Sequence, residues 1–323
     1  MPHLLIAGKI HDAGMALLMN AKGVTYDYVP EISHESYAGL IHRADGLVVR
    51  TQPVPAETIE KATKLKIVSR HGVGYDAVDV AALNMRGIPL AIVGDVNSRP
   101  VAEHAMMLVL ALAKKIRTYD AATRGGDWAL RNRFDSRELD GKTLLIVGFG
   151  RIGRHVAHMA SGFGLKILAY DPGLTPEAIQ AAGAEPVVLL MDGLSRADIV
   201  TLHAPKTGET PLIGSSQLAA MKRSALIVNT ARGGLIDEAA LGDALESGQL
   251  AGAGLDVFSE EPPVVHHPLF DRDDVLFSPH TASLTAEAAI RMAVMSVQNV
   301  LSYFEGRLDP SLVVNRDAIG FGR

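Results

Sequence analysis

The first candidates for chemistry are closely spaced glycines near the middle of the chain. Residues 148–153 match the pattern G-x-G-x-x-G. Without side chains at Gly148 and Gly150, the backbone can turn tightly and approach a pyrophosphate, and Gly153 lets a helix lie close to a sheet. The pattern alone is weak, but it follows an apolar run and opens a helical pattern. We therefore predict a dinucleotide-binding turn made by Gly148, Phe149, Gly150, Arg151, Ile152 and Gly153.

An acidic residue ends the next predicted strand. Residues 166–171 read KILAYD, which places Asp171 about 20 residues beyond the first glycine, where a carboxylate binds the adenosine ribose hydroxyls. A carboxylate there repels the 2′-phosphate of NADP, and the following Pro172-Gly173 supplies no arginine. The simpler interpretation is an ordinary turn with Asp171 capping a strand. Strand, glycines, helix and acid together favour NAD as the cofactor.

Paired histidines elsewhere do not indicate a metal site. His155 and His158 lie one turn apart on the helix after the glycines, but no acid or cysteine completes a ligand set, and H-E-x-x-H is absent. A solvated or packed helix face is the favoured interpretation. His266 and His267 lie in a loop bounded by prolines and are interpreted in the same way, with the rim of an active site as the alternative. No bound metal is expected.

Composition limits the class of protein. The 323 residues predict two domains, and 31 basic against 36 acidic residues give no reason to expect nucleic acid as the main partner. The absence of cysteine excludes disulfides and thiolate chemistry and fits a cytoplasmic enzyme. The first apolar run is too short for a signal peptide, and the longest, Ala105 to Ala113, is too short to cross a membrane. No membrane partner is expected.

Apolar runs alternate with segments of helical period, which is typical of α/β proteins with parallel sheets. Ser98 is expected to cap a long helix from Val101 to about Gly125, and a last helix is predicted at 286–305. The six later strands predict a Rossmann-type sheet. Strands are expected at 4–7, 47–50, 66–70 and 90–93, and then at 144–147, 167–170, 199–203, 226–229, 252–257 and 275–278.

Seven ordered segments carry a resemblance over nearly the whole chain. They are 69–79 (SRHGVGYDAVD), 96–104 (VNSRPVAEH), the glycine turn, 202–205 (LHAP), 228–234 (VNTARGG), 254–262 (GLDVFSEEP) and 278–280 (SPH). In these segments the chain resembles the D-isomer-specific 2-hydroxyacid dehydrogenases, and within them the phosphoglycerate dehydrogenase-like branch. The resemblance implies two Rossmann-like domains with a cleft between. These are a smaller flavodoxin-like substrate-binding (catalytic) domain, 1–98 plus 285–323, and a larger NAD-binding doubly wound domain, 99–284.

The resemblance implies three catalytic residues. Arg232 corresponds to the arginine that holds the substrate carboxylate and polarises the reacting carbonyl, Glu261 to the glutamate that pairs with a histidine, and His280 to that histidine. Hydride addition to a carbonyl carbon produces negative charge on the oxygen, which a guanidinium stabilises. A histidine beside a carboxylate can donate a proton to that oxygen or remove it. Glu260 is the alternative acid, although the family spacing selects Glu261. Taken singly, each residue could equally be a surface or capping group.

Further contacts come from the resemblance alone. It places His203 and Pro205 at the nicotinamide end, Asp256 on the carboxamide, and Thr230 and Ala231 against the cofactor.

The residues expected to bind the substrate lie earlier in the chain. By resemblance, backbone amides of the loop 71–74 (His71, Gly72, Val73 and Gly74) bind the substrate carboxylate. Arg50 and Arg70 match positions that contact the phosphate in phosphoglycerate dehydrogenases. Solvated arginines and a structural turn are the alternatives. His71 replaces an expected small residue, and Gln52-Pro53 replaces small polar ones, which weakens a phosphoglycerate assignment. His71 could instead contact the substrate.

The sequence thus predicts reversible hydride transfer between NAD(H) and the C2 carbon of a small 2-hydroxy or 2-oxo acid, with 3-phosphoglycerate as one candidate and glyoxylate or hydroxypyruvate as its rival. No Tyr-x-x-x-Lys motif supports a short-chain dehydrogenase, and Glu261 disfavours a formate dehydrogenase, which has glutamine there. An NAD-gated corepressor-like binding module is the alternative from another class. The helix beginning near Val101 resembles a dimerisation segment, so a homodimer is expected.

Overall fold

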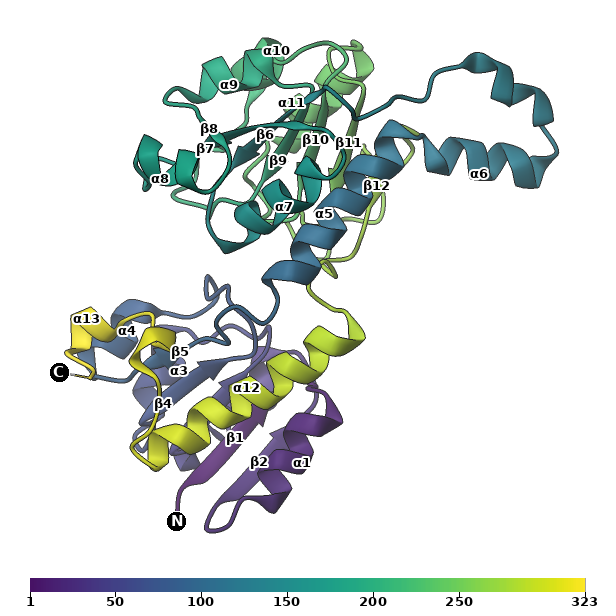
Figure 1. Cartoon of the computed structure of the whole chain (residues 1–323). Coiled ribbons are helices and arrows are strands. Elements are labelled where there is room, and N and C mark those ends of the chain that lie inside the picture. Colours follow the sequence, from purple (N-terminus) through teal and green to yellow (C-terminus); the bar gives the residue numbers. More distant parts are fainter. Residues whose placement is uncertain (323) are drawn as a thin grey trace. The chain divides into compact units, whose positions relative to one another are not determined.

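The structure is a computed structural model, and it describes residues 1–322 (Figure 1). Contacts divide the chain into two units. Unit 1 contains Met1–Asn97 and the chain from Leu284 onward, and unit 2 contains Ser98–Ser283. Each boundary lies one residue before the one expected from the sequence.

Unit 1 is built on a five-stranded parallel sheet with the order β2-β1-β3-β4-β5, which is the flavodoxin-like order. The strand β2 was not predicted, because its sequence TYDYV mixes polar and aromatic residues at a sheet edge. The other four strands were predicted, and their nearly continuous burial explains their apolar composition. The strands are β1 (His3–Ala7), β2 (Thr25–Val29), β3 (Gly46–Val49), β4 (Ile67–Arg70) and β5 (Leu90–Ala91).

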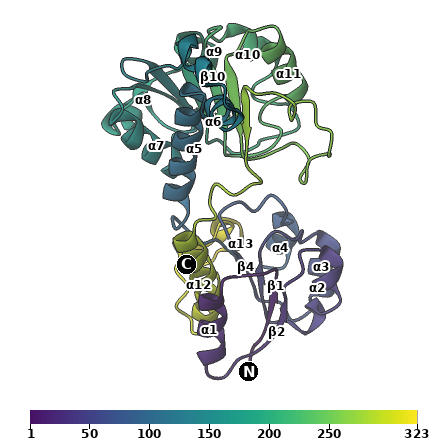
Figure 2. The ribbon, with the colours of Figure 1, turned by 90° about the vertical axis from the view of Figure 1, so that its right-hand side faces the viewer.

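Helices cover both faces of this sheet (Figure 2). On one face α1 (Asp12–Asn20) packs on α12 (Ala286–Phe304), so closely that a Cβ on Gly14 would lie 2.8 Å from the Ala293 carbonyl oxygen. Thr285 caps α12 by accepting the Ala288 amide. The opposite face carries α2 (His34–Ala38), α3 (Ala56–Lys61) and α4 (Val80–Met85), and the short elements of unit 1 are η1 (Ile41–Arg43), η3 (Pro310–Leu312) and α13 (Arg316–Ile319).

Unit 2 is built on a seven-stranded parallel sheet with the order β12-β11-β10-β9-β6-β7-β8. The chain runs outward from β6 in one direction and then returns to start again at β9, so the topological switch point lies between these two strands. Six strands were predicted, and β8, with two residues, was not. The strands are β6 (Thr143–Val147), β7 (Lys166–Tyr170), β8 (Glu185–Pro186), β9 (Ile199–Leu202), β10 (Leu226–Asn229), β11 (Gly252–Leu255) and β12 (Val275–Phe277). The doubly wound α/β class is confirmed.

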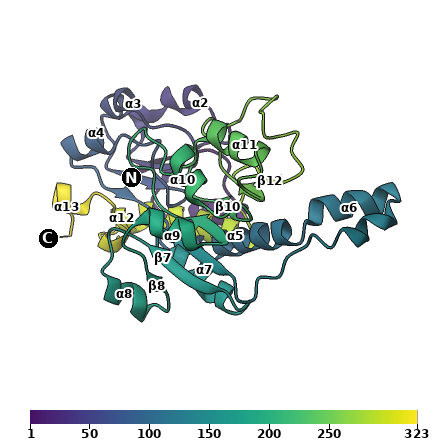
Figure 3. The ribbon, with the colours of Figure 1, turned by 90° about the horizontal axis from the view of Figure 1, so that it is seen from above.

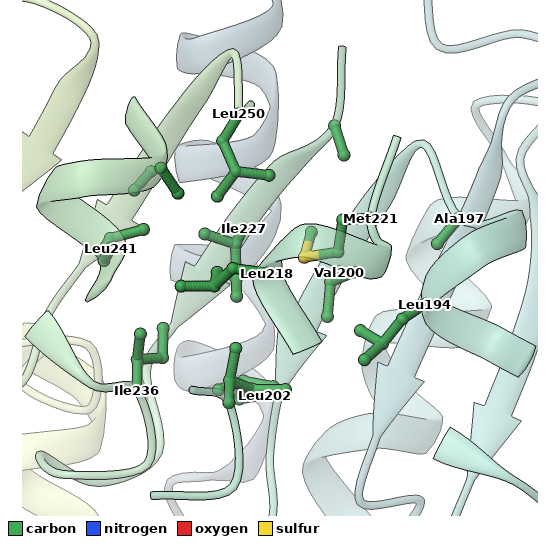
Figure 4. Close-up of a cluster of buried hydrophobic side chains, with 14 of the residues drawn as sticks. Leu194, Ala197, Val200, Leu202, Leu218, Met221, Ile227, Ile236, Leu241 and Leu250 are labelled. Atoms are coloured by element: carbon green, nitrogen blue, oxygen red, sulfur yellow. The ribbon is translucent and has the colours of Figure 1, made fainter. Parts of the chain in front are cut away.

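Two apolar cores sandwich this sheet. Figure 4 shows the core under α9, α10 and α11, where Leu194, Leu218 and Leu241 meet strand residues such as Val200 and Ile227. The other core lies under α5, α7 and α8. The helices are α5 (Ser98–Ala113), α7 (Arg151–Ser161), α8 (Pro176–Ala181), α9 (Leu190–Arg196), α10 (Ser215–Ala220) and α11 (Glu238–Glu246).

The single long helix predicted from Val101 to about Gly125 is wrong. The chain forms α5 and then a second helix, α6 (Ile116–Gly125), because Lys115 adopts a left-handed conformation with φ 49°. Ser98 is a buried residue of α5 rather than a cap before it. No residue of α6 is buried, and α6 projects away from the unit's sheet with η2 (Trp128–Arg133) (Figures 1 and 3). None of the helices among residues 1–322 is long and apolar enough to span a membrane.

Candidate active site

Two of the three glycines after β6 are required by the protein's own packing. Gly148 has φ 90°, and a Cβ there would lie 2.6 Å from the His203 carbonyl group and the Ala204 amide. A Cβ on Gly153 would lie 2.3 Å from the Gly148 carbonyl oxygen. The turn therefore touches the end of β9 at the topological switch point, where doubly wound sheets bind their ligands.

The middle glycine faces open space. Gly150 precedes α7 with φ −74°, which any residue can adopt, and no protein atom lies within 4 Å of a Cβ built there. No side chain caps α7 at this end. Amides at the start of an 11-residue helix, with open space before them, fit an anionic pyrophosphate. The protein itself gives no reason for glycine at this position, whereas a ligand would.

Asp171 lies beside the same turn. Its carboxylate accepts the Phe149 amide at 2.8 Å and the Gly173 amide at 2.9 Å. The Phe149 side chain is buried in the core, so the amide is held firmly. Asp171 is thus a fixed negative charge next to the glycines. Arg151 is exposed and Ile152 half-buried.

Two buried polar atoms without a partner among the described residues mark the neighbouring strand ends. They are Nδ1 of His203, after β9, and Oγ1 of Thr230, after β10. Leu202 and Asn229 pair in the sheet, so the two residues that follow them are neighbours. Burial lowers the pKa of His203 to about 3, which keeps its ring neutral. Buried polar groups rarely remain unpaired, so these atoms fit a polar ligand such as the nicotinamide end of a dinucleotide. Pro205 is exposed and Ala231 half-buried beside them.

The structure brings Glu261 and His280 together. His280 Nδ1 lies 2.7 Å from Glu261 Oε2, and the Phe258 amide donates to Glu261 Oε1 at 3.1 Å. Within residues 1–322 no hydrogen bond to the second ring nitrogen of His280, Nε2, is present. The side chain is 53% exposed, so this nitrogen can reach an incoming molecule. Glu260, the alternative acid, is exposed and is not the partner.

His280 and Glu261 each stabilise the charged form of the other. The hydrogen bond with Glu261, helped by the negative charges of Glu261 and Asp256, raises the pKa of His280 against burial and the charge of Arg232, which lower it. Burial alone would raise the pKa of Glu261, but hydrogen bonds from His280 and the Phe258 amide, with the charges of His280 and Arg232, lower it. The pair therefore favours an imidazolium beside a carboxylate.

Arg232 follows β10 in a tight turn. The Asn229 side chain accepts the Ala231 amide at 3.0 Å and donates to the Arg232 carbonyl at 2.8 Å. The Arg232 guanidinium donates to the Ala231 carbonyl at 2.6 Å. Its charge acts on both Glu261 and His280, so the three predicted catalytic residues share one electrostatic neighbourhood.

Asp256 is completely buried at the end of β11, and it holds the His280 turn. Its carboxylate accepts the Ser278 hydroxyl at 2.5 Å and the amides of Thr281 and Ala282, each at 2.9 Å. His104 Nε2, from α5, lies 2.8 Å from the same hydroxyl. The sequence did not single out His104 or Ser278, although both lie in segments that carry the family resemblance.

The residues predicted to bind substrate lie at the carboxyl edge of the unit 1 sheet. His71 is buried, and its Nε2 has no partner among the described residues. Val49 pairs with Arg70 in the sheet, so Arg50 and His71 follow at neighbouring strand ends. Burial, and then the charges of Arg50 and Arg70, lower the pKa of His71 to about 4.

The loop itself is closely packed. The Arg70 guanidinium donates to the His71 carbonyl at 2.8 Å, and Gly72 has φ 153°. Val73 and Gly74 are half-buried. Gln52 is buried, and its side chain binds the Glu31 carbonyl rather than facing solvent.

No group of three or more metal-ligating residues occurs in the described part of the chain. His155 is half-buried and His158 exposed on α7. His267 binds Glu238, whereas His266 is exposed.

Comparisons with known proteins agree with this geometry. A sequence model described as "D-isomer specific 2-hydroxyacid dehydrogenase, NAD binding domain" matches residues 106–282. The D-3-phosphoglycerate dehydrogenase of Methanocaldococcus jannaschii is 39% identical over 315 residues, which are 97% of this chain. This chain spans 59% of the length of that relative. The glyoxylate reductase of Thermococcus litoralis is 40% identical over 287 residues, 86% of each chain.

Solved structures show the same fold. The TT0316 protein from Thermus thermophilus superposes with a TM-score of 0.87 at 33% identity, covering 95% of this chain and 98% of that one. A glyoxylate reductase from Paecilomyes thermophila gives 0.86 at 30% identity, covering 98% and 99%. The matched NAD-binding region contains the glycine turn, Arg232, Glu261 and His280. The chain belongs to the family of D-isomer-specific 2-hydroxyacid dehydrogenases.

Proposed function

We propose that the protein catalyses reversible hydride transfer between NAD(H) and the C2 carbon of a small D-2-hydroxy or 2-oxo acid. The observation that carries this proposal is the 2.7 Å contact between His280 and Glu261, with the charge of Arg232 acting on both, in the unit that holds the glycine turn. Such a set can bind a carboxylate, stabilise an alkoxide and transfer a proton. The names of the curated relatives support an acid substrate.

Three side chains would perform the chemistry. When bound, NADH supplies the hydride. Arg232 holds the substrate carboxylate and stabilises the negative charge that develops on the C2 oxygen. His280 donates a proton from Nε2 to that oxygen in reduction, and removes it in oxidation. Glu261 fixes the ring through Nδ1 and stabilises the imidazolium.

The cofactor contacts follow the features of unit 2. Gly150 and the start of α7 would hold the pyrophosphate, and Asp171 would bind the ribose hydroxyls and reject a 2′-phosphate. His203 and Thr230 would use their unpaired atoms toward the nicotinamide end. Asp256 keeps one acceptor position for the carboxamide, because a carboxylate has about four and three are occupied. Since Asp256 is completely buried, this contact requires its covering residues to move.

The substrate proposal rests on unit 1. Arg50 and Arg70 supply positive charge around His71, which supports an anionic group beyond the 2-oxo acid, as in 3-phosphoglycerate. The buried His71 ring occupies space where a small residue was expected, and this favours the alternative, glyoxylate or hydroxypyruvate. In either case the loop 71–74 would offer its amides to the substrate carboxylate.

A homodimer is proposed as the working assembly. The exposed segment after α5 carries large apolar side chains: Ile116 is 54% exposed, Trp128 68% and Phe134 87%. Contiguous exposed apolar groups mark interaction surfaces, and the location of these three side chains in one segment supports a partner there. Light scattering on the full chain should give the dimer mass, and a monomeric mass would reject the assembly.

The test of the proposed function is a panel of NADH oxidation assays with glyoxylate, hydroxypyruvate, phosphohydroxypyruvate, pyruvate and bulkier 2-oxo acids. We expect turnover with at least one small acid and none with NADPH at equal concentration. A preference for phosphohydroxypyruvate supports the phosphoglycerate assignment, and a preference for the first two acids supports its rival. NADH binding without turnover of any acid would contradict the enzyme and support a binding module.

A further inference from the structure

A second set of polar side chains lies outside the residues that carry the proposed reaction, and it surrounds Ser259. Glu238, the first residue of α11, accepts both the Ser259 amide, at 2.6 Å, and the Ser259 hydroxyl, at 2.8 Å, on Oε1. Its other oxygen, Oε2, lies 2.9 Å from His267 Nε2. One carboxylate thus joins two points of the loop that also carries Glu261.

The second ring nitrogen of His267 accepts a backbone amide. The Leu269 amide donates to His267 Nδ1, so this nitrogen is an acceptor and the proton is on Nε2. His267 Nε2 therefore donates to Glu238. Its side chain is 12% exposed and that of Glu238 is 17% exposed, so water competes little for the bond. An edge contact with Phe258 and a tilted contact with Phe270 hold the ring in place.

The backbone of Phe258 and Ser259 packs closely against Gly233, the residue after Arg232. A Cβ built on Gly233 would lie 1.6 Å from the Phe258 carbonyl oxygen and 2.9 Å from the Ser259 amide nitrogen. Residues 258–259 therefore lie between Gly233 on one side and Glu238 on the other. The Phe258 amide in turn binds Glu261, whose second oxygen binds His280. Residues 258–259 therefore contact both Gly233, next to Arg232, and the Glu261 carboxylate.

We propose that Glu238 and His267 form a clamp on residues 258–259 that sets the orientation of Glu261 toward His280, and that both are positioning residues for the reaction. This inference rests on the proposed function. Neither residue touches the reacting atoms. The clamp acts because the hydrogen bond between Glu261 and His280 depends on where the Phe258 amide holds the carboxylate. A shift of about 1 Å in a catalytic group can cost about 100-fold in rate.

The clamp predicts a specific change in the titration of His280. The charged groups that act on its ring are Glu261, Asp256 and Arg232. If the clamp is released, Glu261 aligns less well, and the largest influence that raises the pKa of His280 weakens. The pKa should fall, and imidazolium should be lost at lower pH. A residue that only stabilises the fold would not move this titration.

The experiment compares His267→Ala, Glu238→Ala and the conservative variant His267→Gln, whose side-chain amide can still donate to Glu238. The exposed neighbour provides the matched control, His266→Ala. We expect His267→Ala and Glu238→Ala to slow the turnover of the best acid substrate by about 10-fold to 100-fold, with the NADH Kd within about twofold of wild type. His267→Gln should recover most of the rate, and His266→Ala should match wild type.

The deciding readout is the His280 titration followed by imidazole NMR on the NADH-bound full chain, with the signal assigned from His280→Asn. A lower pKa in both alanine variants, with recovery in His267→Gln, supports the clamp. An unchanged pKa, or a loss of rate equal to the loss of folded protein, overturns it. If wild type turns over no acid, the proposed function fails, whereas the titration still tests the clamp.

Discussion

The backbone amide of His280 donates to the carbonyl of Asp256 at 2.8 Å, and this bond holds His280 in a left-handed conformation with φ 52°. Residues other than glycine rarely adopt this region, and they do so mostly where the surroundings impose it. Asp256 imposes this conformation through two groups. Its carbonyl accepts the His280 amide, and its carboxylate binds Ser278, Thr281 and Ala282. The orientation of His280, the proposed proton donor, is therefore set by the buried Asp256 at the end of β11.

Replacing Asp256 with asparagine should destabilise this turn. The asparagine side chain has one acceptor oxygen and an NH2 group that only donates, so at least one of the Thr281 and Ala282 amides would lose its partner in a fully buried place. An unsatisfied buried group costs about 1–3 kcal/mol. We expect denaturant unfolding of Asp256→Asn to show a loss of that size, together with slower turnover. Wild-type stability and rate would show that the turn does not depend on this carboxylate.

Removing the imidazole should separate chemistry from cofactor binding. His280→Ala leaves the glycine turn and the unpaired atoms of His203 and Thr230 in place, so NADH should bind nearly as in wild type. Positioned proton transfer contributes about 10²- to 10⁴-fold to rate, and turnover should fall by that factor. Fluorescence titration with NADH and steady-state assays measure the two effects. Undiminished turnover would refute the assignment of His280.

The pH profile of reduction should report the raised pKa of His280. Reduction needs imidazolium, which is present at low pH and lost as the pH rises through the pKa of the folded protein. Because that pKa lies above the ordinary value, activity should persist beyond pH of about 6.5 before it declines. Glu261→Gln removes the largest cause and should move the decline to lower pH. The same decline in both proteins would exclude Glu261 as the cause.

Alanine substitutions at Gly150 and at Gly153 should have different effects on NADH binding and on stability. Gly150→Ala places a methyl group in open space, so thermal unfolding should match wild type while NADH affinity falls, because the methyl group occupies the space proposed for the pyrophosphate. Gly153→Ala forces contact with the Gly148 carbonyl and should lower Tm. Paired melting curves and NADH titrations distinguish the two. NADH binding by Gly150→Ala as tight as that of wild type would contradict the proposal that the pyrophosphate lies next to Gly150.

His71 should make the protein less stable in mild acid. Its folded pKa of about 4 lies below the ordinary value of about 6.5, so the unfolded chain binds the proton more readily. The contribution of the neutral ring is complete above a pH of about 6.5 and is lost as the pH falls toward about 4. Unfolding of wild type and His71→Asn across this range should show a smaller acid dependence in the variant. Parallel curves would contradict the burial of a neutral imidazole.

The sequence predicted most of the sheet strands, because parallel strands buried on both faces are runs of apolar residues. It missed β2, a half-exposed edge strand, and β8, which has two residues. It also merged α5 and α6, since the helical pattern passes through Lys114 and Lys115 and nothing in it marks a left-handed backbone.

The site was predicted less completely. Spacing singled out the glycines and Asp171 as candidates, and the resemblance supplied Arg232, Glu261 and His280. Neither could show the positive φ of His280, the unpaired atoms of His203 and Thr230, or the bonds from Glu238 to Ser259 and His267. These features depend on contacts between residues far apart in the chain, and each residue type alone is ordinary where it stands.

Following the transferred hydrogen tests the proposed reaction most directly. NADH carrying deuterium at the transferred position of C4 is incubated with the best acid substrate of the panel, and the product is analysed by mass spectrometry and chiral chromatography. We expect one deuterium on C2 of the product, and almost no product with His280→Ala. The product should be the D isomer for every acid except glyoxylate, whose product, glycolate, has no D or L form. Product without deuterium at C2, or the L isomer, would contradict the proposed reaction.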